Sequence, residues 1–526
     1  MKVLVSDTLS EVGLKIFKEA DGIELEYKTG LPSEELKKII GQYDGLAIRS
    51  ATNVTAEIID AATNLKVIGR AGIGLDNVDI PAASRKGIVV MNTPDGNTIT
   101  TAEHTMSMIM SLSRNIPQAT ASLKAGKWEK NKLEGRELFN KTLGLVGAGH
   151  IGQIVADRAL GMKMKVIVYD PYLKAEIAEK LSIEPVSLDE LLKRSDFITV
   201  HTPKTAETTN LINKDTIAKM KKGAMIINCA RGGIVNEKDL YEALKSGYLG
   251  GAAVDVFEKE PPGMIPLMEI SNFICTPHLG ASTFEAQENV AKDVAEQIVD
   301  FLLNGTVKNA VNVPSVSAEL MSILKPYATL VEKMGIFHTQ LADSSIDEVH
   351  INYSGKVAEY DVKPLTSAAL KGLLTPILKD GVNFINASFI AKNRGIKVVE
   401  SKSNTSDDFA SLIYIKVKYR EGENVISGTI FGNTMPRILR INDFYLEAIP
   451  EGHNLLLHNL DVPGIIGRIA TTLGNDGINI ERMAVSQDKK NNRNIILLAT
   501  NASINDSMLN KLGNLENVFS VKKIEL

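Results

Sequence analysis

The segment LGLVGAGHIG, residues 143–152, is an apolar run followed by glycines in the spacing Gly-X-Gly-X-X-Gly. The apolar run predicts a strand, and the residues after the glycines have the spacing of a helix. A second apolar run ends at Tyr169, and Asp170 follows it, 18 residues beyond Gly152. A strand, a glycine loop, a helix and a downstream acid are together typical of a dinucleotide-binding unit.

Each glycine of this loop has a physical reason to be there. Gly147 permits a tight turn, Gly149 lets the backbone approach a pyrophosphate, and Gly152 lets the helix pack on the sheet. The helix N-terminus adds N–H donors and a partial positive charge. Asp170 is followed by proline and tyrosine rather than arginine, so it should bind ribose hydroxyls and repel a 2′-phosphate, which favours NAD over NADP. The alternative is a structural turn with a chance acid downstream.

Short β-rich runs alternate with helical patterns on both sides of the glycine loop. Before it, the predicted strands are residues 2–6, 45–48, 67–69 and 89–91, with helical patterns at 10–20 and 33–41. From the loop onward, the predicted strands are residues 143–146, 166–169, 197–200, 225–228, 251–254 and 273–275. Strands separated by helices predict parallel sheets built from βαβ units.

Two longer helical patterns border the second group of strands. One runs from about residue 100 to residue 125 and ends at Gly126. The other, residues 282–303, is placed to carry the chain back to the first group of strands. We therefore expect the first domain to be discontinuous in sequence. Residues 309–315 (NAVNVPS) contain proline and asparagine and are predicted to be a linker.

Polar residues follow the strands of the second group at the points where the strands end. They include His201, Arg231, Asp255 and His278, and Glu260 lies in the loop after Asp255. Parallel sheets place ligands beyond the carboxyl ends of their strands, so these side chains should share one site.

Their chemistry suits hydride transfer from a carbinol. A histidine can remove the hydroxyl proton, a carboxylate can orient the ring, and a guanidinium can grip a carboxylate through paired donors. Taken singly, each of these residues also fits an ordinary structural role. Cys229 lacks a partner histidine in the pattern and is interpreted as packing beside the cofactor.

The composition is that of a soluble globular protein of about three or four domains. The chain has 526 residues, 44% of them hydrophobic and 23% charged, with a formal net charge of −4. A near-neutral balance without basic runs gives no electrostatic basis for binding nucleic acid. The two cysteines cannot form a disulfide framework, and no Cys/His cluster has zinc-ligand spacing, so no metal is expected. The N-terminus does not resemble a signal peptide and no apolar run approaches a membrane span, so we expect a cytoplasmic protein without a membrane partner.

At these residues the sequence resembles the D-isomer-specific 2-hydroxyacid dehydrogenase family. The segments GAGHIG, NCARGGIV, AAVDVFEKEPP and TPHLGAST are similar to its motifs, and the resemblance covers about residues 1–310. It implies two doubly wound Rossmann-like α/β domains, with the substrate domain split in sequence by the cofactor domain. It implies that Arg231, Glu260 and His278 are catalytic. It also implies contacts with NAD at Gly147, Gly149, His150, Ile151, Gly152, Asp170, Thr202, Cys229, Ala230, Arg231, Asp255, His278, Gly280 and Ala281.

The remainder of the chain resembles the C-terminal part of long members of this family. The segments VNFINASFIAKNRGIKV and GTIFGNTMPRI are similar to an α+β intervening domain, and residues 452–526 predict a ferredoxin-like βαββαβ unit. Within that unit, HNLDVPGIIGRIATTLGNDGINI is similar to an ACT domain, whose DxPG turn binds an amino acid at a subunit interface. The resemblance implies L-serine as effector, held near Asp461 and Asn479. Asn459 stands where relatives often have His or Tyr. The alternative is that the turn is only structural and the domain only oligomerises.

A phosphorylated substrate requires cations. The resemblance implies phosphate and carboxylate contacts at Arg49 (AIRSAT), Arg70 and Gly72 (GRAGIG) and Asn97 (DGNTIT). It also implies a contact contributed by a neighbouring subunit at Lys130 (GKWEK), where the family often has Arg; lysine keeps the charge but loses the bidentate fork. Taken singly, the two arginines also fit surface ion pairs. The backbone amides of residues 71–74 are further candidates for the substrate carboxylate.

The function that the resemblance implies is NAD-dependent oxidation of D-3-phosphoglycerate to 3-phosphohydroxypyruvate, the first step of phosphorylated L-serine synthesis, with feedback by L-serine. It further implies a homo-oligomer, a dimer of dimers. One alternative is a glycerate or hydroxypyruvate reductase with the same core, which needs neither a phosphate-binding cluster nor an amino-acid-sensing tail. Another is a non-catalytic dinucleotide-sensing interaction protein, which would bind NADH without turnover.

These patterns together predict four domains. Residues 1–96 and 283–312 are expected to form a discontinuous substrate-binding domain around an NAD-binding Rossmann domain, residues 97–282. Residues 313–450 are expected to form the intervening domain and residues 451–526 the ACT domain.

Overall fold

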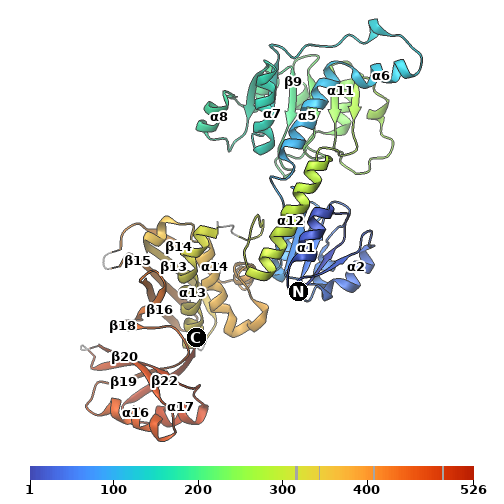
Figure 1. Ribbon diagram of the computed structural model, residues 1–526. Helices are drawn as coiled ribbons and strands as arrows, with labels where there is room; N and C mark the ends of the chain where they lie inside the picture. The colour runs from blue at the N-terminus through green and yellow to red at the C-terminus, as the bar shows by residue number, and fades with distance from the viewer. Residues whose placement is uncertain (314–317, 343, 407–408, 489–490) are drawn as a thin grey trace.

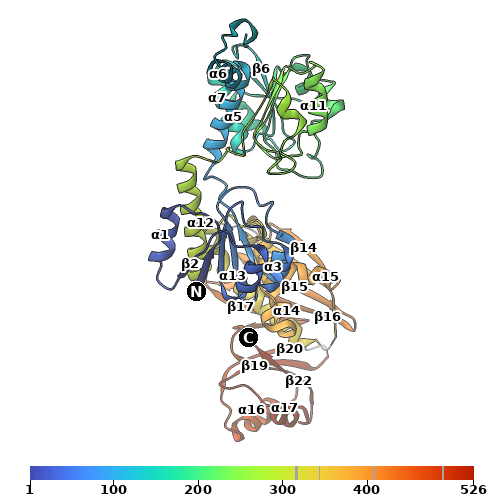
Figure 2. The same ribbon diagram turned by 90° about the vertical axis from the view of Figure 1, so that its right-hand side faces the viewer.

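The computed structural model describes residues 1–313, 318–342, 344–406, 409–488 and 491–526. The described residues form four sheets, one after another along the chain. Figure 1 shows four units in an extended row, with the green unit that contains α7 and α11 at one end and the red C-terminal unit at the other. The blue N-terminal unit lies next to the green one, and the turned view in Figure 2 keeps the same order.

The N-terminal sheet is parallel, in the order β2-β1-β3-β4-β5. Buried apolar side chains line both of its faces, as in a doubly wound sheet. The predicted strands are confirmed, and β2 is an additional edge strand that was missed because its side chains are largely exposed. The elements are β1 (Lys2–Val5), α1 (Glu11–Glu19), β2 (Glu24–Tyr27), α2 (Ser33–Ile39), β3 (Gly45–Ile48), α3 (Ala56–Ala61), β4 (Val67–Arg70), α4 (Ile80–Lys86) and β5 (Val89–Met91).

Helix α12 (Phe284–Asn304) returns to the N-terminal sheet after the second sheet is complete. It packs against α1 and crosses β3 and β4, where Gly45 and Gly69 have no side chain to obstruct it. A Cβ at Gly69 would lie 2.7 Å from Val294 Cγ2, so the close approach requires glycine. Figure 1 shows this long helix running from the green unit down along the blue one.

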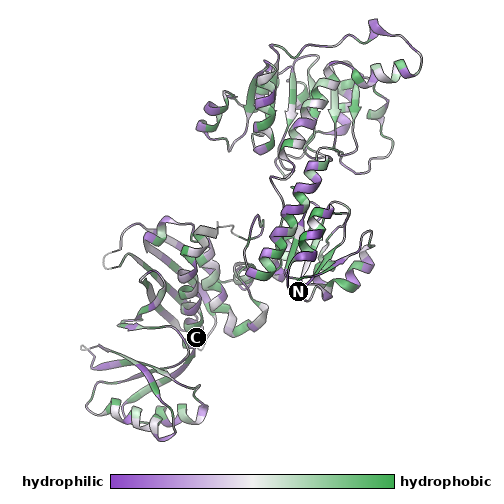
Figure 3. Ribbon diagram, viewed as in Figure 1, coloured by the Kyte–Doolittle hydropathy of each residue, from purple (hydrophilic) through white to green (hydrophobic). Residues whose placement is uncertain are grey.

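The second sheet is also parallel, in the order β12-β11-β10-β9-β6-β7-β8. It has a buried apolar core on each face, and Figure 3 shows green strands at its centre among helices of mixed colour. The six predicted strands are confirmed, and the short exposed β8 was missed. Its elements are β6 (Thr142–Val146), α7 (His150–Gly161), β7 (Lys165–Tyr169), α8 (Ala175–Leu181), β8 (Glu184–Pro185), α9 (Leu188–Arg194), β9 (Phe197–Val200), α10 (Lys214–Ile217), β10 (Met225–Asn228), α11 (Glu237–Lys245), β11 (Gly251–Val254) and β12 (Phe273–Cys275).

The prediction of a single helix over residues 100–125 is wrong. The segment forms two helices, α5 (Thr98–Ser113) and α6 (Ile116–Lys124). Asn115 between them has a φ of 51°, in the left-handed region, which breaks the hydrogen-bond ladder. Pro117 in the first turn of α6 then starts a new helix, because its fixed φ suits that position.

The third sheet has the order β14-β13-β15-β16-β17-β18, with β13 and β14 parallel and the other pairs antiparallel. Helices α13 and α14 pack against each other and bury an apolar core on the sheet. The last two residues of the predicted linker, 314 and 315, lie outside the described residues. The elements are α13 (Ala318–Leu341), β13 (Ile346–Gly355), α14 (Lys363–Leu378), α15 (Ala387–Asn393), β14 (Lys397–Ser403), β15 (Ser411–Tyr419), β16 (Gly422–Phe431), β17 (Met435–Ile441) and β18 (Phe444–Ala448).

The fourth sheet is antiparallel, in the order β20-β21-β19-β22, and the predicted βαββαβ sequence is confirmed. Alternate residues of β19 face opposite ways: Leu455 and Leu457 pack under the two helices of the unit, whereas Leu456 joins the core of the third sheet. The two C-terminal units therefore share apolar packing. The elements are β19 (His453–Leu460), α16 (Ile465–Asn475), β20 (Ile480–Asp488), β21 (Arg493–Thr500), α17 (Asp506–Gly513) and β22 (Val518–Glu525).

None of the helices in the described ranges is both long enough and apolar enough to cross a membrane.

Candidate active site and cofactor site

The glycine loop has the geometry that each of its glycines was predicted to serve. Gly147 has a φ of 94°, and a Cβ there would lie 2.7 Å from the carbonyl oxygen of His201. A Cβ at Gly152 would collide with the carbonyl of Gly147, so the helix could not approach the strand. By contrast, a Cβ at Gly149 would meet nothing within 4 Å. The loop therefore presents bare backbone to open space at the N-terminus of α7, as a pyrophosphate requires.

The carboxylate of Asp170 closes the other side of this loop. It accepts hydrogen bonds from the backbone N–H groups of Ala148 and Tyr172, each 2.8 Å long. These bonds fix the acid at the end of β7, where a ribose would be bound.

Several predicted cofactor residues line the neighbouring strand ends. The hydroxyl of Thr202 is buried and has no hydrogen-bond partner among the described residues, so it fits a ligand that can supply one. Burial raises the pKa of the Cys229 thiol to about 12, which keeps the thiol protonated and agrees with a packing role. His150 is exposed and lies 3.3 Å from Asp95. The open glycine backbone, the fixed acid and the unpaired hydroxyl together fit a dinucleotide such as NAD.

His278 and Glu260 form a hydrogen-bonded pair. His278 Nδ1 lies 2.7 Å from Glu260 Oε2, and the other carboxylate oxygen accepts a 3.0 Å bond from the backbone N–H of Phe257. The imidazole is about half exposed, whereas His201 at the same sheet edge is less exposed. His278 therefore combines an oriented ring with access to a ligand.

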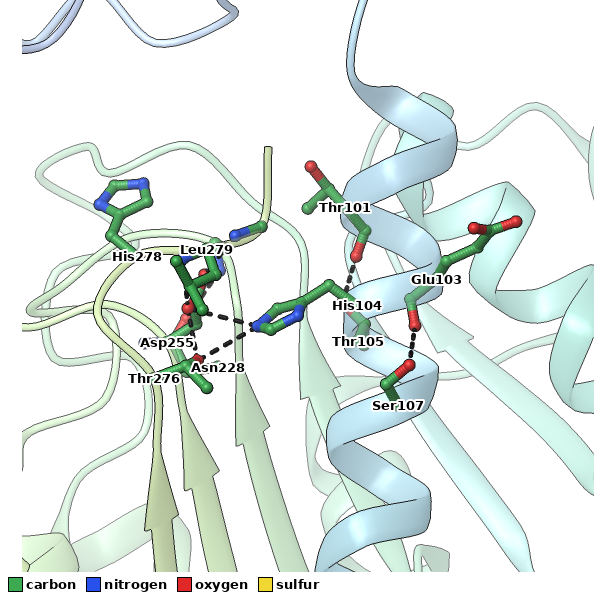
Figure 4. Close-up of polar contacts among 12 residues, drawn as sticks. Thr101, Glu103, His104, Thr105, Ser107, Asn228, Asp255, Thr276, His278 and Leu279 are labelled. Carbon is green, nitrogen blue, oxygen red and sulfur yellow. Dashed lines mark hydrogen bonds and ion pairs between the residues drawn. The ribbon is translucent and has the colours of Figure 1, made fainter. Parts of the chain in front are cut away.

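The turn that carries His278 wraps around a buried carboxylate. Asp255 is 1% exposed, and its oxygens accept hydrogen bonds from Thr276 Oγ1 at 2.5 Å, Leu279 N at 2.7 Å and Gly280 N at 2.9 Å. Its carbonyl oxygen also accepts the N–H of His278. Figure 4 shows His278 projecting past the strand ends, away from this carboxylate. Asp255 thus holds the turn, a role beyond its predicted contact with NAD.

Arg231 projects from a turn at the end of β10 and reaches the N-terminal unit. The side chain of Asn228 shapes this turn by accepting from Ala230 N and donating to the Arg231 carbonyl, both at 3.0 Å. The guanidinium Nε donates to Asp76 at 3.0 Å, and its carbon lies 3.0 Å from where a Cβ of Gly74 would stand. Arg231 therefore lies against the glycine loop that follows β4.

Two further arginines, Arg49 and Arg70, follow strands of the N-terminal sheet, and the charges of Arg49 and Arg231 both act on Arg70. Arg70, at the end of β4, has its guanidinium over Gly72, and its Nε is buried without a partner among the described residues. Burial, together with the positive charge of Arg231, lowers the pKa of Arg70 to about 10. Arg49 follows β3, and burial also lowers its pKa. A group of partly buried cations whose pKa values are lowered in this way suits an anionic ligand.

The backbone amides of residues 71–74 are not all available to a ligand. The N–H of Ala71 donates to the Ile48 carbonyl at 2.9 Å, and that of Gly72 donates to Thr93 Oγ1 at 2.8 Å. In the described part of the chain, the N–H groups of Ile73 and Gly74 have no hydrogen-bond partner. Of the four amides predicted to meet the substrate carboxylate, only those of Ile73 and Gly74 are therefore available. The N–H of Gly72 is already bonded to Thr93, so it is not available to the substrate.

Asn97 is the N-cap of α5 at the junction of the first two units. It is 8% exposed, and its Oδ1 is buried without a partner within the described ranges. A buried acceptor of this kind is costly unless a ligand donates to it.

Comparison with known proteins follows the same division of the chain. Residues 106–280 match the model of the D-isomer specific 2-hydroxyacid dehydrogenase NAD binding domain. Residues 323–442 match the D-3-phosphoglycerate dehydrogenase intervening domain, and residues 453–517 match the ACT domain.

Full-length relatives extend this similarity to the whole chain. D-3-phosphoglycerate dehydrogenase of Synechocystis sp. is 45% identical over 525 residues, which is 99% of this chain and 94% of the relative. The enzyme of the same name from Methanocaldococcus jannaschii is 45% identical over 527 residues, covering 100% of both chains. The chain belongs to the D-3-phosphoglycerate dehydrogenase family.

As a member of this family, the chain is an NAD-dependent oxidoreductase. Its first two units also resemble the solved structure of NAD-dependent formate dehydrogenase from Staphylococcus aureus in complex with NAD. That similarity has a TM-score of 0.54 and 32% sequence identity, and covers 60% of this chain and 100% of that chain. In the described residues, no group of three or more His, Cys, Asp or Glu side chains is placed to hold a metal ion.

Lys130 is the predicted substrate contact that was expected to come from a neighbouring subunit. Lys130 lies in an exposed stretch after α6, and Figure 1 shows α6 at the outer edge of its unit. The contribution of Lys130 to a neighbouring subunit stays a prediction.

The predicted effector residues of the ACT domain lie around the end of β19. Asn459 is fully buried, and Asp461 accepts a 2.9 Å hydrogen bond from Asn494. Asn479 is exposed and, within the described ranges, makes no hydrogen bond to Asn459 or Asp461. The three residues therefore do not form one contact set within a single chain.

Two residues of this family site were missed by sequence reasoning. Asp76 pairs with Arg231, and it could have been found by applying the strand-end argument to the N-terminal sheet as well. His104 lies on α5, with Nε2 3.3 Å from Asp255 Oδ1. A histidine on an amphipathic helix gives no signal of its own, because the sequence does not show which face meets the sheet edge.

Proposed function

We propose that this chain oxidises D-3-phosphoglycerate to 3-phosphohydroxypyruvate with NAD, as the first step of L-serine synthesis. The supporting observation is that the His278–Glu260 pair shares its sheet edge with Arg231, and that the charges of Arg231 and Arg49 both act on Arg70 of the N-terminal sheet. A phosphorylated hydroxy acid has two anionic ends and one carbinol between them. Three guanidinium groups and one oriented base match that distribution of charge and chemistry.

His278 acts as the general base. Because a carboxylate can only accept, Glu260 takes the hydrogen bond from Nδ1–H, and Nε2 is left with its lone pair. Nε2 then receives the proton of the C2 hydroxyl as the carbonyl forms. Glu260 stabilises the imidazolium that results, and the backbone N–H of Phe257 keeps the carboxylate in place.

Arg231 positions the substrate. Its Nε donates to Asp76 and one N–H of Nη1 donates to the Ala230 carbonyl, so Nη2 and the second N–H of Nη1 remain to bind the substrate carboxylate and the carbonyl oxygen that develops. The N–H groups of Ile73 and Gly74 lie beside this group and add donors. Bound NAD supplies the acceptor for the hydride that leaves C2.

The phosphate binds at Arg49 and Arg70. Burial lowers the pKa of both arginines, because their charges have lost water. A bound dianion would stabilise these charges and offset the repulsion between Arg70 and its neighbouring arginines. Lys130 of a neighbouring subunit and Asn97 complete this part of the site. The nicotinamide is placed beside Asp255, and Asp170 binds the adenosine ribose.

The C-terminal units supply regulation and assembly. We assign L-serine as the effector of the ACT domain, bound near Asp461, Asn459 and the Asn479 of an adjoining domain. This assignment agrees with a homo-oligomer, a dimer of dimers in the cytoplasm. The domain boundaries that we propose are residues 1–96 with 283–312, 97–282, 313–450 and 451–526.

The test is the initial rate of NADH oxidation with 3-phosphohydroxypyruvate, set beside hydroxypyruvate under identical conditions. We expect kcat/KM to favour the phosphorylated acid by at least about a hundredfold, because without the phosphate the cations at Arg49 and Arg70 stay unpaired. A preference for hydroxypyruvate would replace the proposal with a reductase of the same family. NADH binding without turnover of either acid would indicate a sensing protein instead.

A further inference from the structure

His104 approaches the catalytic turn from an element outside the sheet. It lies in the middle of α5, and its side chain is 18% exposed. Its Nε2 is 3.3 Å from Asp255 Oδ1 and 3.2 Å from Thr276 Oγ1. Figure 4 shows the ring of His104 pointing from the helix toward these two groups, on the opposite side of Asp255 from the tip of His278.

The hydrogen-bond network fixes the position of a proton on this ring. Thr276 Oγ1 lies 2.5 Å from Asp255 Oδ1, and a carboxylate can only accept, so the threonine hydroxyl donates to Asp255. Its proton is then used, and Thr276 can only accept from His104. Both atoms that face Nε2 are therefore acceptors. His104 must carry a proton on Nε2 and donate it between them.

Asp255 depends on these donors because it is buried. Burial by itself raises the pKa of Asp255, but the hydrogen bonds from His104, Thr276 and the turn backbone outweigh it and hold the pKa below its ordinary value. The carboxylate therefore stays ionised beneath the turn. An ionised carboxylate is also the stronger acceptor for the backbone N–H groups that it organises.

The turn above Asp255 holds His278 in a strained conformation. His278 has a φ of 56°, in a region that non-glycine residues seldom occupy and keep only where their surroundings enforce it. Asp255 enforces it through the N–H groups of Leu279 and Gly280 and, by its carbonyl, through the N–H of His278 itself. The direction in which His278 points thus depends on the carboxylate that His104 contacts.

We propose that His104 is a positioning residue for the catalytic turn: its Nε2–H anchors the Asp255 carboxylate and the Thr276 hydroxyl, and so fixes the direction in which His278 points. The inference rests on the proposed role of His278 as base. His104 does not itself exchange a proton with substrate, because its Nε2 is already engaged and points away from the tip of His278. It also ties α5, which begins just after Asn97 between the first two units, to the turn that must meet the substrate.

Two variants of His104 distinguish the loss of its N–H donor from the loss of its imidazole ring. His104→Leu keeps an apolar side chain of helical propensity but has no donor, and His104→Gln places an N–H near the position of Nε2. The neighbouring Glu103→Gln is the matched control, because Glu103 is exposed on the other side of α5 in Figure 4. The full-length chain is used for each, and turnover is measured with whichever acid, phosphorylated or not, the wild-type chain uses better.

The expected result is a fall in kcat of about tenfold for His104→Leu, since a small misplacement of a reacting group is enough to slow the chemical step. The isotope effect measured with NADH deuterated at the transferred C4 hydrogen should rise, and the Kd for NADH, measured by fluorescence, should change less than about twofold. His104→Gln should recover at least about half of the lost kcat.

Three results would overturn the inference. One is a kcat for His104→Leu equal to that of Glu103→Gln. Another is a glutamine variant as slow as the leucine variant, which would assign the effect to the ring and not to the donor. The third is a slow leucine variant whose NADH affinity and melting temperature fall in proportion, which would indicate general loss of structure. Failure of the substrate proposal would appear separately, as the wild-type chain preferring hydroxypyruvate.

Discussion

The proposed catalytic edge of the second sheet and the proposed effector edge of the ACT sheet differ in how their principal polar side chains are hydrogen-bonded. At the catalytic edge the charged side chains are paired with one another across elements: His278 with Glu260, and Arg231 with Asp76. At the effector edge, the Oδ1 atoms of Asn459 and Asn494 are buried and have no partner among the described residues. The charged side chains of the first edge are therefore paired within the chain, whereas the second edge retains buried acceptors without a partner among the described residues, as the cofactor site does at Thr202 Oγ1.

This difference follows from what each site has to do. A catalytic group must hold its direction before the substrate arrives, so its neighbours already supply its hydrogen bonds. A regulatory site must gain free energy when the effector binds, and burying an unpaired acceptor in the free state makes that gain larger. Charged side chains that act in the reaction can therefore be paired in advance, while the acceptors of a binding site remain unpaired.

The largest expected effect breaks the catalytic edge. His278→Ala should lower kcat by about a thousandfold, because the general base is lost, while the Kd for NADH changes little. Initial rates and NADH fluorescence titrations measure the two quantities. Glu260→Gln, which keeps a hydrogen bond but loses the charge, should fall between this variant and wild type. A His278→Ala chain with wild-type kcat would remove His278 from the reaction.

The next prediction breaks the effector edge. Asp461→Ala should weaken L-serine binding by at least about tenfold, because it removes the carboxylate that we propose as a ligand contact and that Asn494 holds in place. Titration calorimetry with L-serine measures this directly. Glu516→Ala, at an exposed position of the same domain, is the control. Serine binding that is equally tight in both variants would indicate that the turn after β19 is only structural.

A smaller effect tests whether the ion pair between Asp76 and Arg231 orients the arginine before the substrate binds. Asp76→Asn keeps the shape of the side chain but removes the charge that holds Arg231 Nε, at a partly exposed ion pair. We expect KM for the 2-oxo acid to rise about two- to fivefold, with a smaller change in kcat. An unchanged KM would mean that the hydrogen bonds with Asn228 and Ala230 suffice to direct Arg231.

The smallest prediction uses a histidine that belongs to neither edge. His338 is fully buried in the third sheet unit, donates from Nε2 to the Ile415 carbonyl at 3.0 Å, and burial lowers its pKa to about 3. Between about pH 6.5 and pH 3 the unfolded chain binds a proton there that the folded chain does not. The free energy of unfolding should therefore fall by up to about 1.4 kcal/mol per pH unit as the solution is acidified through this range.

His338→Gln retains the donor but does not titrate, so its unfolding free energy should depend less on pH than that of wild type. Urea unfolding at about pH 7 and about pH 5, on either side of the ordinary histidine pKa, gives the change of unfolding free energy with pH for each chain. Equal slopes for the two chains would show that His338 is protonated in the folded state as readily as in the unfolded one.

The sequence was sufficient for features that depend on local pattern. The strand, glycine loop and acid around Gly147, the strand ends at Arg231 and His278, and the βαββαβ order of the last unit all follow from spacing and turn chemistry. Contacts between elements distant in sequence could not be predicted. Asp76 meets Arg231 only because two units face each other, and His104 meets Asp255 only because of how α5 is rotated on its sheet. The break at Asn115 was missed because a left-handed residue inside an apolar pattern leaves the periodicity almost intact.

The central claim is that the cations at the ends of β3 and β4 bind the phosphate of the substrate, and one ratio tests it. The measurement is kcat/KM for 3-phosphohydroxypyruvate divided by kcat/KM for hydroxypyruvate, in wild type, in Arg70→Gln and in the exposed control Lys37→Gln. We predict that Arg70→Gln lowers this ratio by about a hundredfold, through loss of the phosphorylated acid alone, while the control leaves it unchanged. Equal losses for both acids in Arg70→Gln would contradict the claim, because the arginine would then support the fold or the carboxylate and not the phosphate.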